Sequence, residues 1–211
     1  MAAPTSDAIL SAFDELAERT PAAPLFVSSG HRRLSVGGID ALARAARHSL
    51  RTDGAKDVRD QTVGLVAPNG PGFLAAFLAL RRAGARVLLL DAQSPGSDLR
   101  RTATALGASA LFVCRDEWPH GAQSFAWEGL ASLPALPYPE GTSVVKLTSG
   151  STGHPRGVAV SSEALVADDA ALATTMGLRA GERIVATIPM SHSTFVRSPT
   201  RTGLRSSSTS K

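Results

Sequence analysis

The most constraining feature of this sequence is an alternation of short apolar segments with helical segments in the middle of the chain. Residues 62–67, 86–90 and 109–113 are apolar on both faces of an extended chain, and segments with helical periodicity over 72–83 and 95–106 separate them. Strands that are apolar on both faces and connected by helices form parallel sheets with helices on both sides. The expected fold class is therefore α/β, a doubly wound, mostly parallel sheet with flanking helices.

The segments before this alternation predict a smaller N-terminal layer. Residues 6–18 place apolar side chains at helical spacing behind a Thr or Ser cap, which predicts a docking helix. Residues 25–28 and 32–36 flank a Ser-Gly-His turn and predict a short hairpin. A second helix is expected over 39–50, ended by an Asp-Gly pair.

The segments after the alternation are less regular. Residues 115–142 contain four prolines and little periodicity, which predicts a long crossing loop. Strands are expected over 144–148, 158–160 and 183–188, with a helix over 162–175.

A glycine-rich segment over 148–157 directly follows an apolar strand. Its glycines permit positive φ and close approach, so that backbone N–H groups can point at phosphate oxygens, and Arg156 adds a permanent charge. An ordinary Gly/Ser/Thr hairpin loop is the alternative, but the Pro-Arg-Gly end is not what a solvent turn requires. The candidate phosphate-binding residues are Thr148, Ser149, Gly150, Ser151, Thr152, Gly153, Arg156 and Gly157.

The net charge of +4 and the sequence pI of about 10.0 do not indicate nucleic-acid binding. Four positive charges and no acid lie from Phe195 onward, namely Arg197, Arg201, Arg205 and Lys211. The rest of the chain is near neutral, and no aromatic residues are interleaved with its Arg-Arg pairs.

Membrane spanning and export are not expected either. The longest apolar stretch, residues 73–80, is far shorter than the roughly 20 residues that a membrane helix needs. The N-terminus lacks the basic start and apolar block of a secretory signal, so the expected location is cytoplasmic. Cys114 has no ligand-spaced partner and is expected to be a buried structural thiol.

The glycine-rich segment resembles the signature loop of the adenylate-forming superfamily, which includes acyl-CoA synthetases, peptide-synthetase adenylation domains and luciferases. That loop is Thr-Ser-Gly-Ser-Thr-Gly-x-Pro-Lys-Gly, and residues 148–157 match it except for Arg156 at the usual lysine. Residues 64–68 with Asn69, and the Ala-Gly-Ala at 83–85, resemble the family's first core strand and its approach to the next strand. The Leu-Ser pair at 34–35 resembles an early Leu-Thr-Tyr motif, with valine at the tyrosine position.

A further resemblance lies at Pro189-Met190-Ser191-His192-Ser193. It is similar to a family motif whose histidine or aromatic residue lies beside the acyl pocket, so the resemblance implies that His192 shapes the substrate pocket. A loop histidine with no role is the alternative.

The resemblance implies an enzyme that uses ATP and Mg²⁺ to activate a carboxylic acid as an acyl-adenylate, as acyl-CoA synthetase-like ligases do. CoA or a carrier protein would then accept the acyl group. The fold would be a partial copy of the family's N-terminal domain. No catalytic residue and no metal ligand is identified, and the acid and the acceptor are left open.

The domain organisation expected from this resemblance is an N-terminal AMP-binding domain over 1–193 and a disordered basic tail over 194–211. The tail has the composition expected when a GC-rich gene is read in a shifted frame, and the excess of arginine (19) over lysine (3) fits such a gene. The family's Thr-Glu segment and its C-terminal lysine do not occur in the sequence, so little adenylation is expected from the isolated chain.

Two alternative functions remain open from the residues. Residues 70–75 fit the G-x-G-x-x-A pattern of an NAD(P)- or FAD-binding oxidoreductase, with Asp91 at the distance of a ribose-binding acid. Pro68 and Pro71 count against it because they remove backbone donors. The other alternative is a non-catalytic nucleotide-binding remnant.

Overall fold

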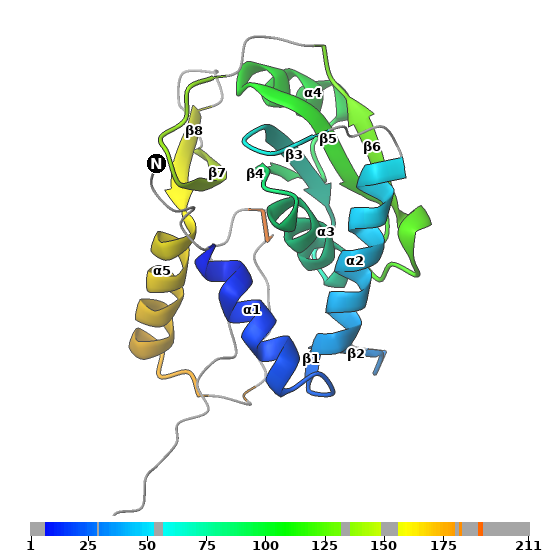
Figure 1. Cartoon of the computed structure of the whole chain (residues 1–211), viewed down its shortest axis with the longest axis vertical. Helices are drawn as coiled ribbons and strands as arrows, with labels where there is room; N and C mark the ends of the chain where they lie inside the picture. Colours follow the sequence, from blue (N-terminus) through cyan, green and yellow to red (C-terminus); the bar gives the residue numbers. More distant parts are fainter. Residues whose placement is uncertain are drawn as a thin grey trace, which may run out of the picture.

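The computed structural model describes residues 7–28, 30–52, 57–131, 136–148, 156–179, 182, 190 and 191. Within them, the dominant feature is a six-stranded sheet with the order β6-β5-β3-β4-β7-β8 (Figure 1). The parallel strands are β3 (Thr62–Ala67), β4 (Arg86–Asp91), β5 (Ala108–Cys114) and β7 (Thr142–Thr148). The edge strands β6 (Phe125–Gly129) and β8 (Arg156–Ser161) pair antiparallel with their neighbours.

The central strand β3 shows why helices cover the sheet on both sides. All six of its residues are buried, and successive side chains point to opposite faces. Val63 and Leu65 belong to the core cluster that contains α3 (Pro71–Arg82), whereas Val66 packs in the cluster of α4 (Gly96–Ala105). The predicted α/β class, with a mostly parallel sheet and flanking helices, is confirmed.

Helix α3 is the most deeply buried helix among the described residues. It lies between the sheet and α2 (Val36–Thr52), and its residues from Pro71 to Leu80 are all buried. Pro71 occupies the first turn, where its fixed φ suits a helix and its missing N–H is not needed. A helix that is apolar on all sides is stable only in such an interior position.

Helix α2 begins at Val36, three residues before the predicted start at residue 39. Ser35 explains the difference, because its Oγ accepts a hydrogen bond from the Gly38 N–H at 3.1 Å. A serine in this position caps the first turn and allows two glycines to enter the helix.

The N-terminal layer consists of α1 (Ala8–Arg19) and a hairpin of β1 (Pro24–Val27) and β2 (Arg33–Ser35), as predicted. It packs on α2 and α3 through Phe13 and Leu16 of α1. The predicted cap, Thr5 or Ser6, is wrong: Asp7 accepts hydrogen bonds from the N–H groups of Ile9 and Leu10. The helix therefore begins two residues later than predicted.

The prediction of a loop over 115–142 is wrong in part. A 3-10 turn (Ala122–Ser124) leads into β6, which pairs with β5. The Phe125 ring stacks on Phe112 of β5, with ring centroids 5.8 Å apart. β6 is stabilised by this non-local contact and by the edge of the sheet, which local periodicity does not report.

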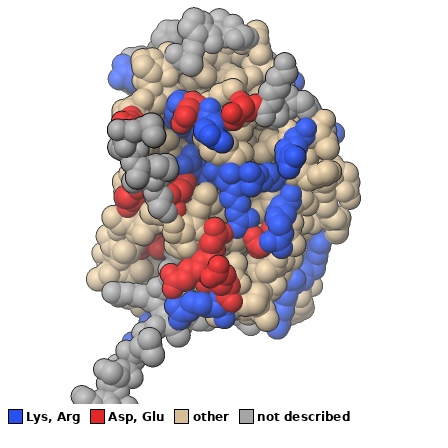
Figure 2. All heavy atoms as spheres, in the orientation of Figure 1, with Lys and Arg blue, Asp and Glu red and all other residues tan. Residues whose placement is uncertain are grey.

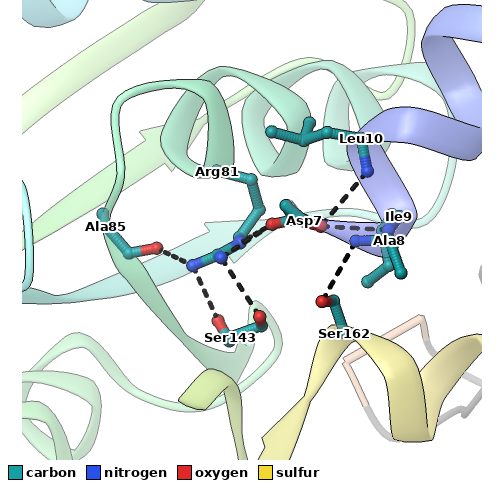
Figure 3. Close-up of polar contacts among 8 residues, drawn as sticks. All are labelled: Asp7, Ala8, Ile9, Leu10, Arg81, Ala85, Ser143 and Ser162. Carbon is teal, nitrogen blue, oxygen red and sulfur yellow. Dashed lines mark hydrogen bonds and ion pairs between the residues drawn. The ribbon is translucent and has the colours of Figure 1, made fainter. Parts of the chain in front are cut away.

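A nearly buried ion pair fastens α1 to the rest of the domain (Figure 3). Arg81, in the last turn of α3, pairs with Asp7 at 2.7 Å, and their side chains are only 11% and 13% exposed. Arg81 also donates to Ser143 Oγ at 3.1 Å, at the start of β7, and to the Ala85 carbonyl. Ser162, at the start of α5 (Ser162–Thr175), accepts from the Ala8 N–H at 3.2 Å. We call Asp7, Arg81, Ser143 and Ser162 the Arg81 clasp.

The predicted strand over 183–188 and the predicted tail over 194–211 lie outside the described residues. Among the described residues, no helix has both the length and the apolar character needed to cross a membrane.

Candidate functional site at the carboxyl edge of the sheet

The carboxyl ends of β3, β4 and β7 lie level with one another. Ala67 of β3 pairs with Asp91 of β4, and continuing the pairing of Leu88 with Val145 places Asp91 level with Thr148 of β7. After β3 the chain continues into α3 on one face of the sheet, and after β4 it continues into α4 on the opposite face. Ligands of open α/β sheets bind where such connections diverge. This edge is therefore the candidate site.

The glycine-rich segment leaves the sheet at this edge. Thr148 and Arg156 are register partners in the antiparallel pair of β7 and β8, and Thr148 Oγ1 donates to the Arg156 carbonyl at 3.4 Å. They form a closed neck where the two ends of the segment meet. Five of the predicted phosphate-binding residues, Ser149, Gly150, Ser151, Thr152 and Gly153, lie outside the described residues.

Arg156 differs from the arginines of α3 and α4. Figure 2 shows basic side chains beside acidic ones on the face in view, and Arg81, Arg82 and Arg100 each form an ion pair with an acidic side chain. Arg156 is exposed and forms no ion pair with any described residue. Its charge is available to an anion that approaches the neck.

Lys146 is a second cation near the neck, and the sequence analysis did not identify it. It lies two residues before Thr148 on β7 and is half-buried. Burial lowers the pKa of Lys146, and the carboxylate of Asp168 on α5 partly opposes this effect. The available signal was a single charged residue within an otherwise uncharged strand.

Gly157 has a packing role that the sequence analysis did not predict. It belongs to β8, and its φ is not positive. A Cβ at this position would lie 2.7 Å from Val145 Cγ1, so glycine is needed for close packing of β8 on the sheet. The positive-φ argument for Gly157 is therefore wrong.

A hydrogen bond brings the predicted acyl-pocket motif to the same edge. Asn69, directly after β3, accepts from the Met190 N–H through Oδ1 at 2.7 Å. Met190 packs against the main core cluster, and Ser191 is buried. His192 itself lies outside the described residues.

The start of α3 is closed to a dinucleotide phosphate. The Gly72 N–H donates to the Glu117 carbonyl at 3.1 Å, and a Cβ on Gly72 would lie 2.4 Å from the Asp116 carbonyl oxygen. A helix N-terminus binds phosphate through free N–H groups in an open approach. Here the approach is filled by backbone carbonyls, which argues against the oxidoreductase alternative.

Cys114 lies at the end of β5 and is buried, as expected for a structural thiol. Its Sγ donates to the Asp116 carbonyl at 3.2 Å. Burial raises the pKa of the Cys114 thiol to about 11, so the thiolate is not formed at neutral pH.

Comparison with known proteins identifies relatives along most of the chain. A model of the AMP-binding enzyme family matches residues 13–209. The 4-coumarate–CoA ligase 5 of Oryza sativa subsp. japonica is 27% identical over 219 residues, which cover 92% of this chain and 40% of the ligase. The D-alanine–D-alanyl carrier protein ligase of Listeria welshimeri is 27% identical over 203 residues, covering 87% of this chain and 38% of that protein.

The fold is also similar to that of solved structures. The O-succinylbenzoate–coenzyme A synthetase of Bacillus subtilis, solved in complex with AMP, has a TM-score of 0.66 at 16% identity, covering 86% of this chain and 50% of that chain. This chain thus spans less than half the length of the two curated ligases and half of the synthetase.

Proposed function

Because this chain belongs to the AMP-binding enzyme family, we propose that it supplies the phosphate-binding edge of a site that activates a carboxylic acid with ATP. The observation that supports this most is the neck formed by Thr148 and Arg156, with an exposed arginine that pairs with no described acid, at the carboxyl edge of a parallel sheet.

The chemistry explains why such an edge is needed. A carboxylate oxygen attacks the α-phosphorus of ATP, the bond from that phosphorus to the bridging oxygen breaks, and pyrophosphate leaves with the electron pair. The product is an acyl-adenylate, in which AMP is a far better leaving group than oxide. Charge moves onto pyrophosphate in this step, and fixed donors and cations stabilise it best when they are positioned in advance.

In this proposal Arg156 neutralises the phosphate charge, and the backbone of residues 149–155 supplies N–H donors, as the loop resemblance implies. Thr148 keeps the neck closed instead of donating its hydroxyl to phosphate, because that hydroxyl already binds the Arg156 carbonyl. Gly157 acts through packing, by letting β8 lie close to Val145.

Mg²⁺ and the acyl acceptor are further parts of the proposal. The described residues contain no group of three His, Cys, Asp or Glu side chains placed to hold a metal. Mg²⁺ commonly binds through substrate phosphates with only one or two protein carboxylates, so we propose that it enters with the triphosphate. CoA and a carrier protein are the two acceptors that the resemblance implies for a following thioester step.

Arg156→Ala tests the proposal in the purified 211-residue chain. Loss of a charge-assisted contact should weaken ATP binding about tenfold or more, measured by equilibrium dialysis with labelled ATP. Arg156→Lys should keep most of the affinity, because the family loop carries lysine at this position. Arg101→Ala is the matched control, since Arg101 is an exposed arginine of α4 that pairs with Asp98.

An exchange assay separates the enzyme from a non-catalytic remnant. Acid-dependent exchange of labelled pyrophosphate into ATP, tested with a panel of acids that includes 4-coumarate and D-alanine, reports acyl-adenylate formation directly. ATP binding without exchange would favour the remnant. Absence of ATP binding by the unaltered chain would contradict the proposed function.

A further inference from the structure

Lys146 and Arg156 project from the same face of the sheet. Side chains alternate along a strand, so Lys146 lies on the same face of β7 as Val144, which belongs to the main core cluster. On β8, Val160 is the register partner of Val144 and packs against the same cluster, and Arg156 lies four residues before it on the same face. The register partner of Lys146 is Val158, so Lys146 and Arg156 are diagonal neighbours, with their Cβ atoms roughly 7 Å apart. Two positive charges therefore lie side by side at the neck.

The approach to this pair of cations is open on the side of β8. Val158, directly opposite Lys146, is 47% exposed, and Arg156 is exposed too. α5 covers the same face nearer to the start of β7, where Leu165 is buried in the main core cluster with Val144. Lys146 lies between these two environments and is half-buried. A lysine in such a position can cover its aliphatic stem with apolar neighbours and hold its ammonium at the boundary with solvent.

One described acid acts on Lys146. Asp168 lies one helical turn after Leu165, on the same side of α5, and its carboxylate attracts the Lys146 ammonium. Lys146 nevertheless forms no ion pair with any described acid, and neither does Arg156. Like charges at neighbouring positions of a strand pair repel each other. Because one carboxylate balances only one of the two cations, an anion with several negative charges would stabilise the pair.

We propose that Lys146 is a second cationic residue of the phosphate site and binds the same polyphosphate anion as Arg156, an inference that rests on the proposed function. The planar guanidinium of Arg156 presents its donors in a fixed fork, whereas the ammonium of Lys146 is a compact point charge on a flexible stem. Lys146 lies about 7 Å before the neck along β7. In this arrangement the carboxylate of Asp168 competes with the bound anion for the Lys146 ammonium.

Two variants of the 211-residue chain should change ATP binding in opposite directions, measured by equilibrium dialysis with labelled ATP. Lys146→Met removes the charge but keeps an unbranched side chain, and it should weaken ATP binding about tenfold, whereas Lys146→Arg should keep most of the affinity. Asp168→Asn removes the competing carboxylate and should strengthen ATP binding about two- to fivefold. Asp98→Asn is the matched control, because α4 packs on the opposite face of the sheet. If Lys146 and Asp168 only fastened β7 to α5, both variants would weaken ATP binding alike, and that result would overturn the inference.

Chemical protection of the lysine gives an independent readout. The chain has only three lysines, Lys56, Lys146 and Lys211, so the acetylation of each can be followed by mass spectrometry of its peptide. ATP or inorganic tripolyphosphate at ten times its Kd should slow acetylation of Lys146 about tenfold, because only about a tenth of the sites are then free. Adenosine should not slow it, and Lys56 and Lys211 are the internal controls. Arg156→Ala should reduce the protection of Lys146, since both cations bind the same anion.

The outcomes of this experiment distinguish the inference from the proposed function. ATP binding that depends on Arg156, with acetylation of Lys146 at an unchanged rate, would overturn the inference alone. Protection of Lys146 by tripolyphosphate without any binding of ATP would support the pair of cations as an anion site and contradict the proposed function.

Discussion

The sheet has two regions that bury their residues very differently. In the core unit, residues 62–114, every residue of β3 is buried, and so is α3 from Pro71 to Leu80. In the wing, residues 142–175, the first three residues of β8 are exposed, and Ser162 and Leu165 are the buried residues of α5. Most of the buried apolar residues of the described chain lie in the core unit. The wing carries the glycine-rich segment.

This difference indicates how stability and chemistry are divided in the chain. A segment that binds phosphate must keep its polar groups accessible, so the end of β7 and the start of β8 beside it are not covered as β3 is, although the first four residues of β7 are buried. The wing is held instead by parallel pairing of β7 with β4 and by the Arg81 clasp at the opposite edge of the sheet. Changes in the core unit should therefore affect the whole fold, and changes in the wing should act locally.

The largest effect is expected from Phe77→Ala in α3. Phe77 is 1% exposed within the main core cluster, and truncation of a buried phenylalanine costs about 3–5 kcal/mol. Val158→Ala in β8 is the wing counterpart, because Val158 is 47% exposed and should change stability by about 0.5 kcal/mol or less. Urea unfolding measures both. Equal losses would remove the distinction between core unit and wing.

The next effect concerns the Arg81 clasp. Arg81→Ala leaves the nearly buried carboxylate of Asp7 without its cationic partner, although Oδ1 still accepts from the Ile9 and Leu10 N–H groups. The change should cost about 2–4 kcal/mol, since breaking a nearly buried pair leaves an uncompensated charge. Arg19→Ala is the control, because its pair with Glu15 is half exposed and should contribute about 0.5 kcal/mol. Limited proteolysis should then cut near α1 in Arg81→Ala first. Unchanged cleavage would mean that apolar packing alone holds α1.

Cys114 in the core unit and Lys146 in the wing should make stability depend on pH in opposite directions. Burial raises the pKa of the native Cys114 thiol from its ordinary value of 9.0 to about 11. Between these two values the native state holds a proton that the unfolded chain has released, so the free energy of unfolding falls as pH rises through this window. The loss is on the order of 2 kcal/mol. Burial lowers the pKa of Lys146 in the native state, so the native state releases this proton at a lower pH than the unfolded chain does. The cost of keeping the charged ammonium half-buried therefore disappears, and the free energy of unfolding rises, as pH rises towards 10.5.

Two variants separate these contributions in unfolding experiments between pH 8 and pH 11. Cys114→Ala should remove the fall in stability, and Lys146→Met should remove the rise. If Cys114→Ala left the fall unchanged, the thiol would be titrating as it does in the unfolded chain.

The same division explains how much of the structure could be predicted from sequence. The strands of the core unit were predicted to within a residue or two, because burial on both faces produces a continuous apolar pattern that needs no knowledge of partners. β6 was missed since its strand character depends on Phe112, which lies outside its own segment.

The candidate site was less predictable for a related reason. The loop motif located the neck of Thr148 and Arg156, but residue type did not reveal that Gly157 is needed for packing. Nor could periodicity report that Asn69 meets Met190, because the contact depends on the complete fold. Local patterns identify segments, whereas contacts between distant segments require the structure.

The smallest effect, and the sharpest test of the wing, is expected from Gly157→Ala. The added methyl would lie 2.7 Å from Val145 Cγ1, and overpacking of this kind costs about 1–3 kcal/mol. Gly129→Ala in β6 is the matched control, because its added methyl would meet no described atom within 4 Å, and it should change stability little. Val145→Ala would leave space for the methyl, so the double variant should lose less stability than the sum of the two single variants. If the stability losses of the two single variants simply added in the double variant, the close approach of β8 to Val145 would not be the reason for glycine at position 157. A role in the phosphate-binding loop would then be the better explanation for Gly157.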